Sequence, residues 1–210
     1  MRNVLLLCRT DCFRLCGMPR FSAVYLLILA AFSVSTHVAP IGYMMACYVL
    51  SAAVAGFDDN GAGGFFTGTL PVTRAQVVWE KYLFCTAFLL LADVAVLLVN
   101  SAAARLLPPA VNPLPIGPLL ALQFCGAAAT IAVSLPLILL LGSIRARYGL
   151  VIVYMAVFFL LYRYASEAGR GGIPPLASGA VSLFWLVGAA ALLASALITA
   201  RLYREHEYLQ

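Results

Sequence analysis

The sequence offers few side chains that could carry out covalent or metal chemistry. Its two histidines, His37 and His206, lie on opposite sides of the membrane architecture predicted below, so they cannot share a site. No HExxH or GxSxG motif occurs. A phosphate-binding Walker loop needs a lysine after glycine, and the single lysine, Lys81, lies in WEKY instead. We therefore expect no enzyme activity, metal or cofactor in this chain itself.

Two groups of residues begin to look like metal sites, but neither has a complete set of ligands. Cys8, Cys12 and Cys16 share one helical face without a histidine or clustered carboxylates, which favours packing or interfacial burial over metal binding or palmitoylation. Asp58 and Asp59 open the segment DDNGAGGFFTGT like a calcium loop, but threonine stands twelfth, where an EF-hand needs glutamate. We interpret this segment as a flexible connection.

Asp93 is the acidic residue nearest the middle of a long apolar segment. A carboxylate there is costly and is by default a functional residue. It could face a transport pathway, or it could be protonated and hydrogen-bonded between helices; both readings stay open. In another apolar segment Pro136 should kink the helix and leave the carbonyl of Ala132 without its usual backbone donor.

The composition places these residues in a membrane protein. The 210-residue chain is 64% hydrophobic and only 10% charged, whereas a soluble domain is about 25% charged. A spanning helix needs about 20 mostly apolar residues. Six segments are candidates, the first two of them short, and the predicted fold class is all-α with six transmembrane helices. The predicted spans are Phe21–Thr36, Pro40–Gly56, Tyr82–Ala103, Pro118–Leu141, Gly149–Tyr164 and Ser178–Ala200.

The remaining segments complete a single transmembrane domain over residues 1–210. Residues 1–20 are predicted to form an interfacial helix with Val4, Leu5, Cys8, Cys12, Leu15 and Cys16 on its apolar face and Asp11 on its polar side. Residues 57–81 form a loop and a charged helix, and residues 201–210 form a tail. If the N-terminus is cytoplasmic, ten of the thirteen cationic side chains lie inside, which is the expected bias. This orientation puts both termini and residues 57–81 in the cytoplasm.

The charged helix has a start that the sequence specifies locally. In TLPVTRAQVVWEKYL, Thr73 and Gln76 have the spacing of a capping box, in which the Thr73 hydroxyl accepts the Gln76 amide and the Gln76 side chain reaches back. Val72 and Val77 form a hydrophobic staple, and Pro71 stiffens the approach. Such a fixed elbow serves either as a tidy helix start or as a docking element for a partner protein.

The pattern FDD at Phe57 followed by LPVTRAQVVWEKYL from Leu70 resembles the permease subunits of bacterial ABC type-2 transporters. The resemblance implies that the helix starting at Thr73 is a coupling helix, which docks into a separate ATPase that binds ATP and Mg²⁺. It is specific over about 27 residues, and the glycine-rich loop departs from the family pattern. The residues it assigns to coupling are Asp58, Asp59, Leu70, Pro71, Thr73, Arg74, Gln76, Glu80 and Lys81.

By size and motif the chain is most similar to compact permeases that export amphipathic peptides such as bacteriocins. That resemblance implies a bacterial cytoplasmic membrane, ABC ATPase subunits as partners and a second permease subunit, either a copy or a sister chain. No nucleic-acid partner is expected, because the net charge of +5 reads as a topology signal. The alternative is a six-span substrate-capture subunit of a vitamin importer, which a co-purifying vitamin would favour. An intramembrane enzyme would have only Asp93 as its acid.

Overall fold

The structure is a computed structural model of the chain, and it describes residues 2–17, 54, 72–106, 116–142, 145–146, 148–151 and 178–205. Within these residues the chain is helical and has no strand. The helices are α1 (Arg2–Cys16), α5 (Arg74–Leu106), α6 (Ile116–Leu141) and α8 (Ser178–Glu205). The predicted spans before residue 57, apart from Val54, and all but the first three residues of the fifth lie outside the described part. So do Asp58, Asp59, Leu70 and Pro71.

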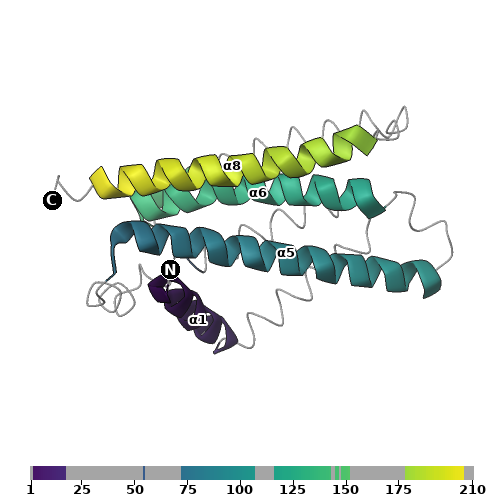
Figure 1. Cartoon of the computed structure of the whole chain (residues 1–210), viewed down its shortest axis with the longest axis horizontal. Helices are drawn as coiled ribbons and strands as arrows, with labels where there is room; N and C mark the ends of the chain where they lie inside the picture. Colours follow the sequence, from purple (N-terminus) through teal and green to yellow (C-terminus); the bar gives the residue numbers. More distant parts are fainter. Residues whose placement is uncertain are drawn as a thin grey trace.

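Three long helices lie side by side, and α1 lies across the first part of α5 (Figure 1). α6 and α8 run in the same direction, opposite to α5, so that the start of α5 meets the ends of the other two. Each of the three is long and apolar enough to cross a membrane, over Arg74–Leu98, Gln123–Leu141 and Val181–Tyr203. The third, fourth and sixth predicted spans therefore coincide with helices of sufficient length.

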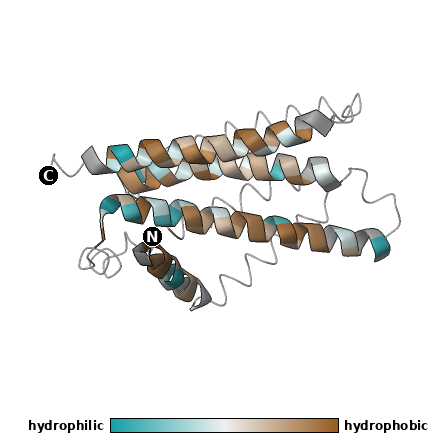
Figure 2. Cartoon of the chain, viewed as in Figure 1, coloured by the Kyte–Doolittle hydropathy of each residue, from teal (hydrophilic) through white to brown (hydrophobic). Residues whose placement is uncertain are grey.

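Hydrophobic residues predominate along these helices, and hydrophilic residues lie at both ends of α5 and at points between them (Figure 2). The shared core is built from small and branched residues of α5 and α6, among them Cys85, Leu89, Ala127, Ile131 and Leu135. By contrast, many leucine and valine side chains on the outer sides of α5 and α8 are exposed. This distribution suits a bundle whose outer surface meets hydrocarbon rather than water.

The contact between α6 and α8 is the most extensive one among the described helices. The rings of Phe124 and Trp185 stack with their centroids 4.2 Å apart. At Gly188, a Cβ atom would lie 2.9 Å from the Phe124 ring and 3.3 Å from the Cα of Cys125. A glycine is therefore required for the two backbones to approach this closely.

α6 ends where glycine allows it to end. Gly142 has a φ of 78°, in the left-handed region that side chains disfavour. Its amide donates to the carbonyl of Ile138 at 3.0 Å, so the last turn of α6 closes on a glycine directly after Leu141. The predicted end of this span at Leu141 is confirmed.

α1 packs on α5 with Asp11 in the contact. Asp11, predicted on the polar side of the helix, is 3% exposed and lies against α5, whereas Leu5 and Phe13 are 68% and 64% exposed. Asp11 is the only acidic side chain of α1, and it pairs with the buried Lys81 of α5. The interfacial position of this helix stays a prediction.

Candidate functional site

The helix start predicted at Thr73 is present, with one of its two expected bonds replaced. The side-chain Oε1 of Gln76 accepts the backbone N–H of Thr73 at 3.0 Å, as a capping box requires. The N–H of Gln76 donates to the carbonyl of Thr73 at 2.8 Å rather than to its hydroxyl. The first turn of α5 is thus closed by its own residues, and the helix begins at Arg74.

Arg74 is held against the end of α8. Its guanidinium carbon lies 5.8 Å from the centroid of the Tyr203 ring, within the range of a cation–π contact. Arg74 is partly buried, so part of the side chain stays accessible. Since Tyr203 lies in the last turn of α8, this contact ties the start of one long helix to the end of another.

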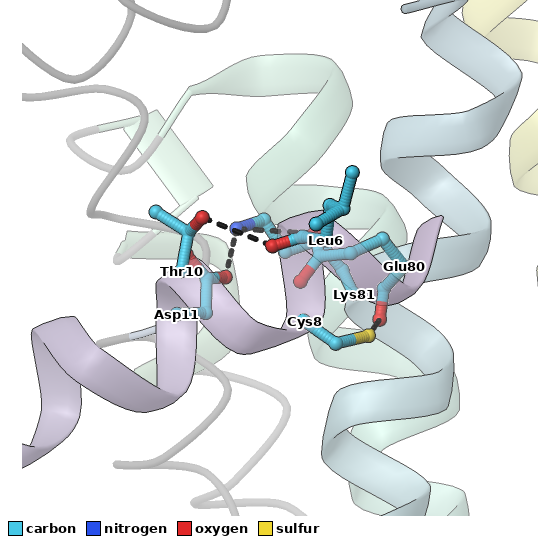
Figure 3. A network of polar contacts seen from close by, with 6 residues as sticks. All are labelled: Leu6, Cys8, Thr10, Asp11, Glu80 and Lys81. Atoms are coloured by element: carbon cyan, nitrogen blue, oxygen red, sulfur yellow. Dashed lines mark hydrogen bonds and ion pairs between the residues drawn. The ribbon is translucent and has the colours of Figure 1, made fainter. Parts of the chain in front are cut away.

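Glu80 and Lys81, expected near an ATPase surface, lie inside the contact between α1 and α5. Both residues are 1% exposed. The Nζ of Lys81 lies 2.5 Å from the Oδ2 of Asp11 and 3.4 Å from the Oε2 of Glu80 (Figure 3). One cation is therefore buried between two carboxyl groups that come from different helices. An ion pair of this kind holds α1 on α5, because both charges are buried and each would lose this partner if the two helices separated.

Cys8 lies in the same cluster, beside Glu80 in Figure 3. Its Sγ donates to the carbonyl of Glu80 at 3.8 Å. Burial, followed by the nearby charges of Glu80 and Asp11, raises the pKa of the Cys8 thiol to about 11. The thiol is therefore protonated at neutral pH and acts as a weak hydrogen-bond donor. In the described part of the chain no group of histidine, cysteine and acidic residues could hold a metal ion.

Asp93 is 6% exposed, in the middle of α5. Gln123 of α6 is 1% exposed, and neither its amide oxygen nor its amide nitrogen has a hydrogen-bond partner. Buried polar side chains inside a membrane bundle are costly, which makes both residues candidates for a polar pathway. The position of Asp93 fits either reading of it, as a pathway residue or as a residue held between helices.

The start of α5 is thus capped by its own residues and contacts α1 and α8, and the helix is long and apolar enough to cross a membrane. The model of the family described as "ABC-2 family transporter protein" matches residues 15–204. The chain belongs to the ABC-2 transporter family. Comparison with curated proteins and with solved structures gives no significant match.

As an ABC-2 family member, the chain is the membrane-embedded permease component of an ABC transporter, and it works with an ABC ATPase. It is a membrane transport component. Of the coupling residues implied by the resemblance, the structure brings Thr73, Arg74 and Gln76 together at the accessible first turn of α5. Glu80 and Lys81 lie one to two turns further on, and buried.

Sequence reasoning about this ABC-2 chain missed the partners that α5 finds in other helices. The helical pattern places Asp11 on the polar side of residues 1–20, and hydropathy places Tyr82, the residue after Lys81, at the start of a span; neither pattern indicates a partner in another helix. The Tyr82 hydroxyl lies 2.6 Å from the Ser195 hydroxyl of α8. The pairing of Asp11 with Lys81 could have been inferred from how few charged residues of each kind there are. α1 has one acidic residue and the chain has one lysine. Each lies among apolar residues, where a charged side chain requires a partner.

Proposed function

We propose that the chain is the permease half of an ATP-driven exporter of amphipathic or antimicrobial peptides in a bacterial cytoplasmic membrane. A second permease, either a copy or a sister chain, completes the pathway. Two separate ATPase subunits bind ATP and Mg²⁺ on the cytoplasmic side, where both termini lie. Closure of the ATPases moves the starts of the α5 helices, and the halves rock to expose their cleft on the opposite side.

The observation that carries this proposal is the continuity of α5. It runs for 33 residues without interruption from the capped start at Arg74 to Leu106. At about 1.5 Å per residue, one rigid rod of about 50 Å reaches from the charged end through the whole apolar layer. Force applied at its first turn is therefore delivered inside the membrane.

The residues near the start of α5 contribute to coupling in two different ways. Arg74 and Gln76 lie on the accessible first turn, where an ATPase can reach them. Glu80 and Lys81 are buried, so they act through α1, which the Lys81–Asp11 pair fixes to the rod. α1 and the start of α5 then move as one body. Asp58, Asp59, Leu70 and Pro71 complete the elbow in this proposal.

The test is reconstitution of the chain with its ATPase in liposomes. The pair should co-purify, and the permease should raise ATP hydrolysis several-fold. Gln76→Ala removes the acceptor of the Thr73 amide and should weaken the helix start by about 1 kcal/mol, lowering this stimulation. Gln76→Glu keeps an acceptor at the same place and should preserve it.

Inverted vesicles then test the cargo with a fluorescent amphipathic peptide, which should accumulate only with ATP. If the purified chain neither binds the ATPase nor changes its turnover, coupling through α5 is wrong. If hydrolysis is stimulated while no peptide accumulates, the permease role stands and the peptide assignment is wrong.

A further inference from the structure

Pro136 leaves a carbonyl of α6 without its helical donor, and a hydroxyl from α8 takes the donor's place. Proline has no N–H, so the carbonyl of Ala132, four residues earlier, loses its bond within the helix. The Oγ of Ser195 donates to this carbonyl at 2.6 Å. In a membrane an unsatisfied carbonyl is costly, so the Ser195 hydroxyl is needed where it lies.

A second hydroxyl, from α5, holds Ser195 in that position. The Oη of Tyr82 lies 2.6 Å from the Oγ of Ser195 and 3.1 Å from the Oγ1 of Thr199. Ser195 has one hydroxyl proton, which goes to Ala132, so Tyr82 must be the donor to Ser195. Thr199 donates its own proton to the carbonyl of Ser195 at 2.7 Å. The hydroxyl protons of Tyr82, Ser195 and Thr199 therefore each have one assigned acceptor.

This arrangement, which we call the hydroxyl relay, consists of Tyr82, Ser195 and the Ala132 carbonyl, and it crosses three helices. It begins one residue after Lys81, whose side chain pairs with α1. It ends four residues before Pro136, the point where α6 can bend. A shift of α5 along its axis would either break the hydrogen bond between Tyr82 and Ser195 or move Ser195 together with Tyr82. In both cases the hydrogen bond from Ser195 to the Ala132 carbonyl, on which the bend depends, would change.

We propose that Tyr82 is a positioning residue for transport, which acts through Ser195 to set the bend of α6 at Pro136. The bend is thereby linked to the position of the coupling end of α5. This inference rests on the proposed function for its role in transport, while the link between Tyr82 and the bend is a property of the chain alone. The two parts are tested separately.

The first experiment measures the bend without any ATPase. Spin labels at the exposed positions Gly117 and Leu141, in a cysteine-free background, report the end-to-end distance of α6 by pulsed EPR in nanodiscs. Tyr82→Phe, which keeps the ring and removes the hydroxyl, should shift or broaden the distance distribution. Tyr148→Phe, at a tyrosine that is 76% exposed, is the matched control and should change nothing.

Pro136→Ala makes this test specific to the relay. Alanine at this position restores an N–H that can donate to the Ala132 carbonyl, so the hydroxyls become dispensable. Tyr82→Phe should then have no effect in the Pro136→Ala background. An unchanged distribution for Tyr82→Phe in the native background, or an equal change in both backgrounds, would overturn the proposal.

The second experiment measures ATP hydrolysis by the reconstituted complex. Tyr82→Phe should reduce the stimulation by the permease roughly threefold, the size expected for losing one interhelical hydrogen bond in a membrane. If the native chain gives no stimulation, the proposed function fails and the EPR result alone decides the link. If the native chain stimulates and Tyr82→Phe stimulates equally, the role of Tyr82 in transport is wrong.

Discussion

Lys81 is the residue on which the charge balance at the start of α5 depends. It is the only cation in contact with two buried carboxyl groups in the described part of the chain, one of them on another helix. Its side chain and that of Asp11 are 2% and 4% exposed, so water screens their interaction very little. The consequences of losing each member of the cluster therefore differ.

Lys81→Met should destabilise the chain by about 3–5 kcal/mol, because Asp11 and Glu80 then lose the ammonium group that is buried between them. Asp11→Asn should cost less, since Glu80 still lies 3.4 Å from the Lys81 ammonium. The measurement is thermal or denaturant unfolding in detergent micelles. Arg9→Met is the control: Arg9 is exposed and makes only a cation–π contact with Phe13 at 5.5 Å. A loss for Lys81→Met no larger than that of Arg9→Met would contradict the ion-pair account.

Cys8 gives a second prediction for single residues, this time of chemical reactivity. Burial raises the pKa of its thiol to about 11. The thiolate, which is the reacting form, is therefore scarce at neutral pH and increases about tenfold per pH unit up to about pH 10. In single-cysteine variants, Cys12, which is exposed, should react with a maleimide at pH 7.5 at least about ten times faster than Cys8. Equal rates would show that Cys8 is open to solvent and that α1 does not pack on α5 as described.

Among the described helices, α6 and α8 share the most extensive contact, and Gly188 lies in it. Gly188→Ala should separate the two helices and cost about 1–3 kcal/mol, because the new methyl group meets the backbone of Cys125 as well as the Phe124 ring. Gly117→Ala is the matched control, since a Cβ at Gly117 in the first turn of α6 meets nothing within 4 Å. Unfolding of both variants in the same detergent makes the comparison. Equal stabilities would mean that the helices can move apart without loss.

What the sequence predicted correctly at this scale is what depends on neighbours along the chain. The start of α5 follows from Thr73 and Gln76, three residues apart, and the missing helical donor to the Ala132 carbonyl follows from Pro136, four residues later. Both are present. The pairing of Lys81 with Asp11 joins residues 70 apart, and no local pattern encodes it. The helical pattern of α1 likewise places Asp11 on the polar side of the helix but cannot show that it pairs with a residue of α5.

The directions of the helices also constrain how the chain connects them. α6 and α8 run the same way, so a chain that crosses the membrane in each must return once, or another odd number of times, between them. One return is what the predicted fifth span supplies. α5 and α6 run in opposite directions and are separated by a connection of nine residues, from 107 to 115, as adjacent spans require.

For the whole molecule, the charges at the ends of the helices define two sides. Arg74 and Lys81 lie in the first part of α5, and Arg201 lies near the end of α8, at the same end of the bundle. Arg105 lies in the last turn of α5, at the other end. Cationic residues near the ends of spans prefer the cytoplasm. The start of α5 and the end of α8 should therefore be cytoplasmic, as coupling to an ATPase requires.

Arg105 and Arg201 test this orientation directly, because both are exposed and they lie at opposite ends of the bundle. In intact cells, a membrane-impermeant maleimide should label an Arg105→Cys variant and should leave Arg201→Cys unlabelled until the membrane is permeabilised. Each variant is made in a cysteine-free background, so that no native thiol contributes. The reverse pattern would place the capped start of α5 outside the cell, where no ATP-driven partner could reach it. Coupling through this helix would then be impossible, even though the chain would remain an ABC-2 permease by family.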